Sequence, residues 1–118
     1  MRILQPPRWP RPSGYANGVA AEGRMVFVAG QVGWDETGAF RSDDFVDQVR
    51  LALENTLAVL AEAGAGPEHV ARMTWYVTDR LEYLACAKEV GRVYRELMGR
   101  HFPAMTMVEV AALIEDRA

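Results

Sequence analysis

The stretch from His101 to Val110 constrains the fold more than any other part of the chain, because after Pro103 it alternates as a β-strand does. One face carries Met105, Met107 and Glu109, and the other carries Thr106, Val108 and Val110. β-Branched side chains suit a face packed under helices. Methionine adapts to irregular partners, so the first face is suited to another subunit or a pocket. Burial of both faces fits the methionines equally well, but a buried Glu109 carboxylate would need a partner.

Hydrophobic patterning predicts the order strand, strand, helix, strand, helix, strand. The predicted elements are a hairpin of residues 19–21 and 25–29, a turn at 35–38, a helix at 44–63, a strand at 72–78, a helix of about five turns between Asp79 and Gly99, and a strand at 104–110. Ser42, Asp43 and Asp44 offer capping oxygens to the first helix and Asp79 caps the second, while Gly64 and Gly99 supply their stops. Both helices have an apolar stripe. This order predicts an α+β fold in which two helices pack on one face of a mixed sheet.

Length and charge narrow the class of protein. A chain of 118 residues predicts a single domain, 1–118, with an extended lead-in at 1–13 that is rich in proline and arginine. The net charge of −3 gives no general attraction to nucleic acid, and no apolar run approaches the length of a membrane span. Cys86 is the only cysteine, so no intrachain disulfide can form. These features predict a cytoplasmic protein with no nucleic-acid or membrane partner.

No motif in the chain identifies a catalytic residue, a cofactor or a metal. His69 and His101 do not stand in a metal-binding spacing, and Cys86 has no second thiol. There is neither a P-loop nor a GxGxxG pattern. The two amides Gln48 and Asn55 lie two helical turns apart on one face, and we expect them to tie the helix to neighbouring backbone. No cofactor and no metal are predicted.

Several segments together resemble the RidA/YjgF family, also called endoribonuclease L-PSP. The run Phe102-Pro103-Ala104-x-Thr106-x-Val108-Glu109-Val110 is similar to its Pro-Ala-Arg-Ser/Thr-x-Val-x-Val signature. The other matching segments are Gly14-Tyr15, 27–31, Gln48 with 55–57, 63–64 and 74–79. The resemblance covers the whole chain and implies a chorismate-mutase-like fold. It also implies one further strand, beyond the position of Ala118.

The family resemblance implies a homotrimer with small-molecule clefts between subunits. RidA proteins are hydrolases that convert enamines and imines into keto acids and ammonia, and an arginine pairs with the substrate carboxylate. The cleft positions implied for this chain are Tyr15, Ala29, Gly30, Gln31, Gly91, Met105, Met107 and Glu109. The family's arginine falls on Met105, its serine on Ala29 and its pocket cysteine on Met107.

Three hypotheses about function remain open. The first is a RidA-family trimer that binds a less charged small molecule and lacks 2-aminoacrylate deaminase activity, because methionine offers no donor to a carboxylate. The second is an active enamine or imine deaminase with altered anchoring, in which Arg24, Arg72 or Arg92 replaces the arginine. The third is a non-catalytic ligand-binding or structural trimer.

Overall fold

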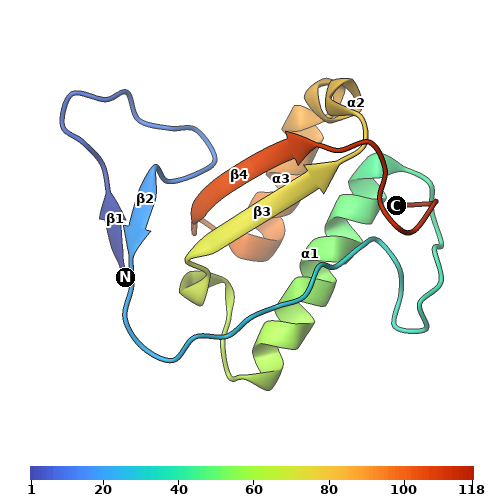
Figure 1. Ribbon diagram of the computed structural model, residues 1–118, viewed down its shortest axis with the longest axis horizontal. Helices are drawn as coiled ribbons and strands as arrows, with labels where there is room; N and C mark the ends of the chain where they lie inside the picture. Colours follow the sequence, from blue (N-terminus) through green and yellow to red (C-terminus); the bar gives the residue numbers. More distant parts are fainter.

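The computed structural model describes all 118 residues. Its elements are β1 (Arg2–Leu4), β2 (Gly18–Ala20), α1 (Phe45–Glu62), the single-turn helix η1 (Pro67–His69), β3 (Arg72–Val77), α2 (Arg80–Ala85), α3 (Ala87–Met98) and β4 (Ala104–Glu109). β3 and β4 form a parallel pair, and β1 and β2 a separate antiparallel pair (Figure 1). Helices α1 and α3 pack on one face of the β3–β4 pair. The predicted α+β architecture with helices on one face is confirmed.

The hydrophobic core lies between the two long helices and the β3–β4 pair. The six buried residues at its centre are Val49, Leu53, Val90, Val93, Tyr94 and Met98. All come from the apolar stripes of α1 and α3, because residues three and four apart share one face of a helix. Met73, Trp75 and Met105 pack against this cluster from the strands. None of the helices combines the length and apolarity needed to span a membrane.

The predicted limits of α1 are confirmed at both ends. The Asp44 carboxylate accepts a hydrogen bond from the Asp47 backbone N–H at 3.0 Å, as an N-cap does. Gly64 follows the helix with a φ of 70°, a left-handed conformation that glycine adopts without strain. The amides act as expected. Gln48 donates to the carbonyl oxygen of Ser42, and Asn55 donates to the carbonyl oxygens of Val32 and Trp34.

The predicted assignment of faces in β4 is wrong. Met105 lies opposite Met73 and is half-buried among the core residues, so the Met105 face is the one under the helices. Thr106 and Val108 are exposed on the other side. β-Branched residues suit a strand on either face. The long methionine side chains fill the irregular space beneath the helices, which the smaller threonine and valine would leave partly empty.

The predicted hairpin of residues 19–21 and 25–29 is also wrong. β2 pairs with β1 instead, with Ile3 opposite Val19, so the predicted lead-in supplies a strand. Residues 25–29 belong to no strand and run alongside α1 (Figure 1). Alternation in a single sequence shows that a segment suits a strand, but it does not show which segment provides the backbone partner.

The predicted second helix is divided into two. Asp79 caps α2 as expected, because its carboxylate accepts from the N–H groups of Leu81 and Glu82. The helix ends at Cys86, whose φ of −108° departs from helical geometry, and α3 begins at Ala87. α2 buries no residue, whereas α3 buries four. Because the helix is broken, α2 can leave β3 in one direction while α3 takes another and lies along α1.

Candidate functional site

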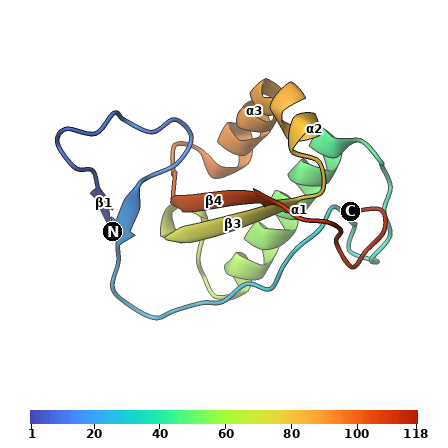
Figure 2. The ribbon, with the colours of Figure 1, turned by 45° about the horizontal axis from the view of Figure 1, so that its top comes forward.

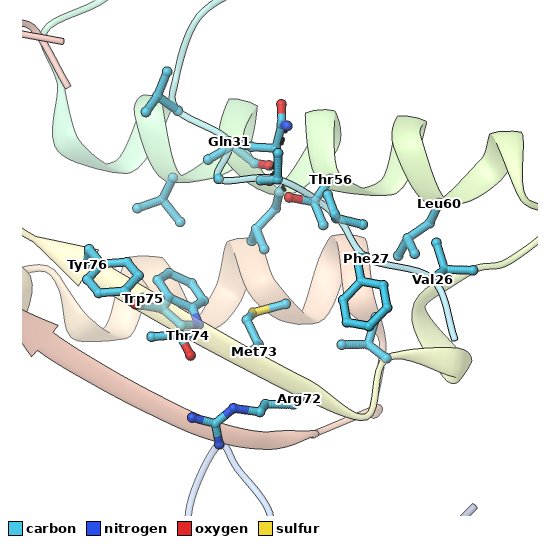
Figure 3. A pocket seen from close by; sticks show the side chains of 18 of the residues that line it. Val26, Phe27, Gln31, Thr56, Leu60, Arg72, Met73, Thr74, Trp75 and Tyr76 are labelled. Atoms are coloured by element: carbon cyan, nitrogen blue, oxygen red, sulfur yellow. Dashed lines mark hydrogen bonds between the residues drawn. The ribbon is translucent and has the colours of Figure 1, made fainter. Parts of the chain in front are cut away.

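A large hollow lies between residues 21–34 and β3, over α1. We call it the β3 slot. One wall is the extended segment 23–33, the other wall is β3, and the floor is Val49, Ala52, Leu53, Thr56 and Leu60 of α1. Its volume is about 1490 Å³. Figure 3 shows Phe27 and Gln31 on one wall and Thr74 and Trp75 on the other.

Three of the predicted cleft positions lie on the wall of the β3 slot that faces β3. Ala29, Gly30 and Gln31 are consecutive in the extended segment, and the Gln31 side chain donates to the Ala29 carbonyl at 3.3 Å. A Cβ added at Gly30 would meet no atom within 4 Å. The backbone at these positions is therefore open to a ligand or to another chain.

Two further positions, Tyr15 and Met105, lie near the start of β4. The Ala16 N–H donates to the Pro103 carbonyl at 3.0 Å, and Ala16 pairs with Ala104. Because this bridge is parallel, Tyr15 falls opposite Pro103, two residues before Met105. The Tyr15 side chain is exposed, whereas Met105 packs against the core. The two side chains therefore stand in different environments.

The remaining three positions lie elsewhere. Met107 is half-buried in the middle of β4, and Gly91 lies on α3. The Glu109 carboxylate accepts a hydrogen bond at 2.9 Å from the backbone N–H of Arg80, at the first turn of α2. A carboxylate that accepts a hydrogen bond at a helix N-terminus stabilises the helix, so Glu109 has a structural role there. The eight positions do not converge on one point of a single chain.

Within a single chain, none of the three candidate arginines (Arg24, Arg72 and Arg92) replaces the family's arginine at the position of Met105. Arg24 donates to the Ala63 carbonyl at 3.0 Å and so holds the end of α1. Arg72 pairs in register with Ala104, one residue before Met105, which places it on the opposite face of the sheet. Arg92 is exposed on α3. The strand neighbours of Met105 on its own face, Met73 and Met107, are apolar.

Strongly shifted ionisable groups lie away from these positions. Hydrogen bonds from Thr37 and Arg41 hold the pKa of the Asp35 carboxyl well below its usual range, and these three residues form the loop after residue 34. Burial raises the pKa of Tyr94 to about 12. No cluster of three or more acidic, histidine or cysteine side chains is placed to hold a metal ion.

Sequence reasoning did not identify the β3 wall and the α1 floor as part of a site. Trp75, Met73 and Thr56 line the β3 slot, and the buried Trp75 indole N–H has no hydrogen-bond partner. The signals present in the sequence are the alternation of residues 72–77 and the apolar stripe of α1. Both patterns predict a buried face and cannot distinguish a packed face from a hollow one.

Comparisons with known proteins cover nearly the whole chain. The family model for Endoribonuclease L-PSP matches residues 10–118. A RutC family protein from Pyrococcus abyssi is 35% identical over 108 residues, which span 91% of this chain and 82% of the relative. TdcF of Escherichia coli, provisionally named a reactive intermediate deaminase, is 32% identical over 120 residues, which span 98% of this chain and 88% of the relative.

Comparison with solved structures also finds members of the same family. YyfB of the Rid protein family from Yersinia pestis superimposes with a TM-score of 0.85 at 28% identity, over 98% of this chain and 90% of that one. TdcF from Escherichia coli with bound serine gives a TM-score of 0.67 at 33% identity, over 98% of this chain and 91% of that one. Family model, relatives and folds agree, and the chain belongs to the RidA/YjgF family, the family described as Endoribonuclease L-PSP.

Proposed function

We propose that this chain forms a cytoplasmic homotrimer that binds a small molecule of low charge in clefts between subunits and hydrolyses 2-aminoacrylate poorly or not at all. The observation that carries the proposal is Met105. The family signature aligns it with the carboxylate-binding arginine, and its side chain packs against the apolar core. A thioether donates no hydrogen bond, so a substrate carboxylate would be left without a charged partner there.

The missing arginine sets the expected loss in the rate of 2-aminoacrylate hydrolysis. A guanidinium binds a carboxylate through two parallel charge-assisted hydrogen bonds. Loss of such a contact in the transition state costs on the order of 2–4 kcal/mol, a factor of about thirty to a thousand in rate. The relative TdcF has been solved with bound serine, a ligand that carries a carboxylate. We infer that the ligand of this chain lacks that group.

The exposed face of the β3–β4 pair supports the trimer. This open face, turned away from the helices, carries Thr74, Tyr76, Thr106 and Val108. Tyr76 is 57% exposed and Val108 is 39% exposed, side by side in the parallel register. Neighbouring apolar side chains left in water favour a protein contact. We therefore propose that the open face is buried between subunits.

Light scattering at micromolar concentration tests the assembly. We expect a trimer mass for the unmodified chain and a smaller mass for the double variant Tyr76→Lys, Val108→Lys, because two ammonium groups in an apolar contact lack partners. Leu84→Lys is the matched control, since Leu84 is equally exposed but lies on α2. A monomeric unmodified chain would contradict the proposed assembly.

Ammonia release from enzymatically generated 2-aminoacrylate tests the activity. We expect negligible turnover by the unmodified chain and a gain of at least about thirtyfold for Met105→Arg, the lower end of the range for a charged contact. Leu84→Arg places the same new charge on α2, away from Met105 in β4, and should gain nothing. Unmodified turnover equal to that of an arginine-bearing family member would refute the proposal.

A further inference from the structure

Positive charge is concentrated in the first part of the chain, where the first acidic residue is Glu22. Residues 1–21 contain Arg2, Arg8 and Arg11 and no carboxylate side chain, although the whole chain has a net charge of −3. All three arginines are exposed, and none forms an ion pair within the chain. The molecule therefore has a local positive region that its net charge does not show, and such a region attracts an anionic surface.

The loop that carries two of these arginines has a defined shape. We call residues 5–17 the arginine loop; it joins β1 to β2 and projects away from the helices (Figures 1 and 2). The Asn17 side chain donates to the side-chain oxygen of Gln5 at 2.9 Å and closes the base of the loop. The Gln5 amide donates to the carbonyl oxygens of Trp9 and Pro10, at 3.1 and 3.3 Å. A loop held in this way loses little conformational freedom when it binds a partner.

Exposed apolar side chains accompany the arginines. Trp9 stands between Arg8 and Arg11 in the sequence and is 59% exposed. Ile3 of β1 is 57% exposed, and Tyr15 is also exposed. Tryptophan is enriched at the boundary between water and lipid, and arginines near a bilayer are attracted by anionic headgroups. The combination of residues therefore suits an interface that is both anionic and apolar.

We propose that the arginine loop binds the surface of a bilayer that contains anionic phospholipid. Arg8 and Arg11 pair with headgroup phosphates, because a guanidinium donates two parallel hydrogen bonds to a phosphate. The Trp9 ring enters the headgroup region between them. The inference goes beyond the proposed function. It departs from the expectation of no membrane partner, which considered a membrane-spanning run and not binding to the membrane surface.

Two considerations favour a bilayer over other anionic partners. The arginine loop is shorter than the roughly 20–30 residues that each side contributes to a stable protein interface. A nucleic-acid strand pairs with arginines through its phosphates, but that backbone has no counterpart for an aliphatic side chain such as Ile3. A bilayer offers phosphates and hydrocarbon in one surface and requires no complementary pocket for a projecting loop.

The proposed homotrimer strengthens this contact. Rotation about a three-fold axis places three copies of the arginine loop at the same height along the axis, so one flat surface can meet all three. Linked weak contacts bind much more tightly than a single one. This gain depends on the proposed trimer, whereas the contact of a single loop does not. Light scattering under the binding conditions separates the two, because a monomer that still binds anionic vesicles contradicts only the trimer.

Sedimentation with vesicles tests the inference on the whole chain. The probe is a vesicle of equal parts phosphatidylglycerol and phosphatidylcholine, and the control vesicle is pure phosphatidylcholine. We expect binding to the anionic vesicle to be at least about tenfold tighter than binding to the neutral one. A rise in salt from about 0.1 M to about 0.5 M should weaken it at least about tenfold, because salt screens exposed charges.

A pair of double variants locates the charge. Arg8→Gln, Arg11→Gln should weaken binding to the anionic vesicle at least about tenfold, because each arginine near the surface contributes separately. Arg95→Gln, Arg100→Gln is the matched control, since it removes two exposed arginines outside the arginine loop and changes the net charge equally. The control should bind as the unmodified chain does. Circular dichroism should show both variants folded, because all four side chains are exposed.

Tryptophan fluorescence locates the apolar contact. Addition of anionic vesicles should shift the emission to shorter wavelength, because the exposed Trp9 ring leaves water. Trp34 and Trp75 are half-buried outside the arginine loop and should not respond. The shift should therefore be absent in Trp9→Phe, whose vesicle binding is measured by sedimentation.

Four results would overturn the inference. The first is no binding to the anionic vesicle, and the second is equal binding to both vesicles. The third is an equal loss of binding in the two double variants, which would assign the attraction to charge in general. The fourth is an unchanged emission of the unmodified chain on bound vesicles. Binding of a single-stranded RNA oligomer together with no binding of vesicles would assign the arginine loop to nucleic acid instead.

Discussion

Tyr94 provides a sharp test of how the core is held together. Its side chain is 5% exposed, and its hydroxyl donates to the His101 carbonyl at 2.6 Å. The ring stacks on Phe102 with centroids 5.5 Å apart. Tyr94→Phe keeps the ring and removes only the hydroxyl, which leaves that carbonyl without this donor. We expect a loss of about 1–2 kcal/mol in the free energy of unfolding at neutral pH.

The same residue predicts a dependence of stability on alkaline pH. Burial raises the pKa of Tyr94 to about 12, above its ordinary value of 10.0. The folded state therefore keeps the proton at a pH where the unfolded chain has lost it. The resulting contribution is fully present below about pH 10 and is lost as pH rises through about 12. Two pKa units correspond to about 2.7 kcal/mol.

Urea denaturation followed by circular dichroism measures both effects, with samples at about pH 8 and about pH 11.5. The difference in stability between the unmodified chain and Tyr94→Phe should shrink at the higher pH, because only the former loses the Tyr94 contribution. Tyr83→Phe is the matched control, since the Tyr83 hydroxyl makes no hydrogen bond within the protein and its ring is only half-buried. A difference that stays constant with pH, or a fully stable Tyr94→Phe, would refute the reasoning.

Three further substitutions probe the packing that supports the site. Met98 is 1% exposed, and Met98→Ala should cost about 2–4 kcal/mol in urea denaturation because it opens a cavity; a cost below about 1 kcal/mol would contradict the packing. Asp44→Ala should cost about 1 kcal/mol by removing the N-cap of α1, and Asp44→Ser should restore most of it. A Cβ at Gly33 would lie 2.5 Å from that of Gln48, so Gly33→Ala should lower Tm and cost about 1–3 kcal/mol, whereas Gly30→Ala, with open space around it, should not.

The helices and the parallel strands were predictable because their signals are local. The stripe of α1, the cap at Asp44 and the glycine stop at Gly64 each depend on residues within a few positions of one another. The division between α2 and α3 at Cys86 was not predictable from them, since the pattern of apolar residues continues across it. The direction in which α3 packs is decided by its contacts with α1.

The candidate site shows the same division between local and distant information. The substitution of the family arginine by Met105 is a property of the sequence alone, and it already predicts weak binding of a carboxylate. The side of the sheet on which Met105 lies cannot be read from the sequence in the same way. Alternation defines two faces, but it does not say which one the helices cover. Trp75 and Met73, beside β4 in the parallel register, place the Met105 face under the helices.

The order of α1, β3, the helical region after Asp79 and β4 follows from the residues alone, as do the family and the chemistry available at Met105. The pairing of β2 with β1, and the separation of residues 25–31 from β3 by a hollow of about 1490 Å³, depend on contacts between segments far apart in the chain. Strand pairing depends on backbone groups that every residue carries alike, so the partner of a strand is set by which edges the fold brings together.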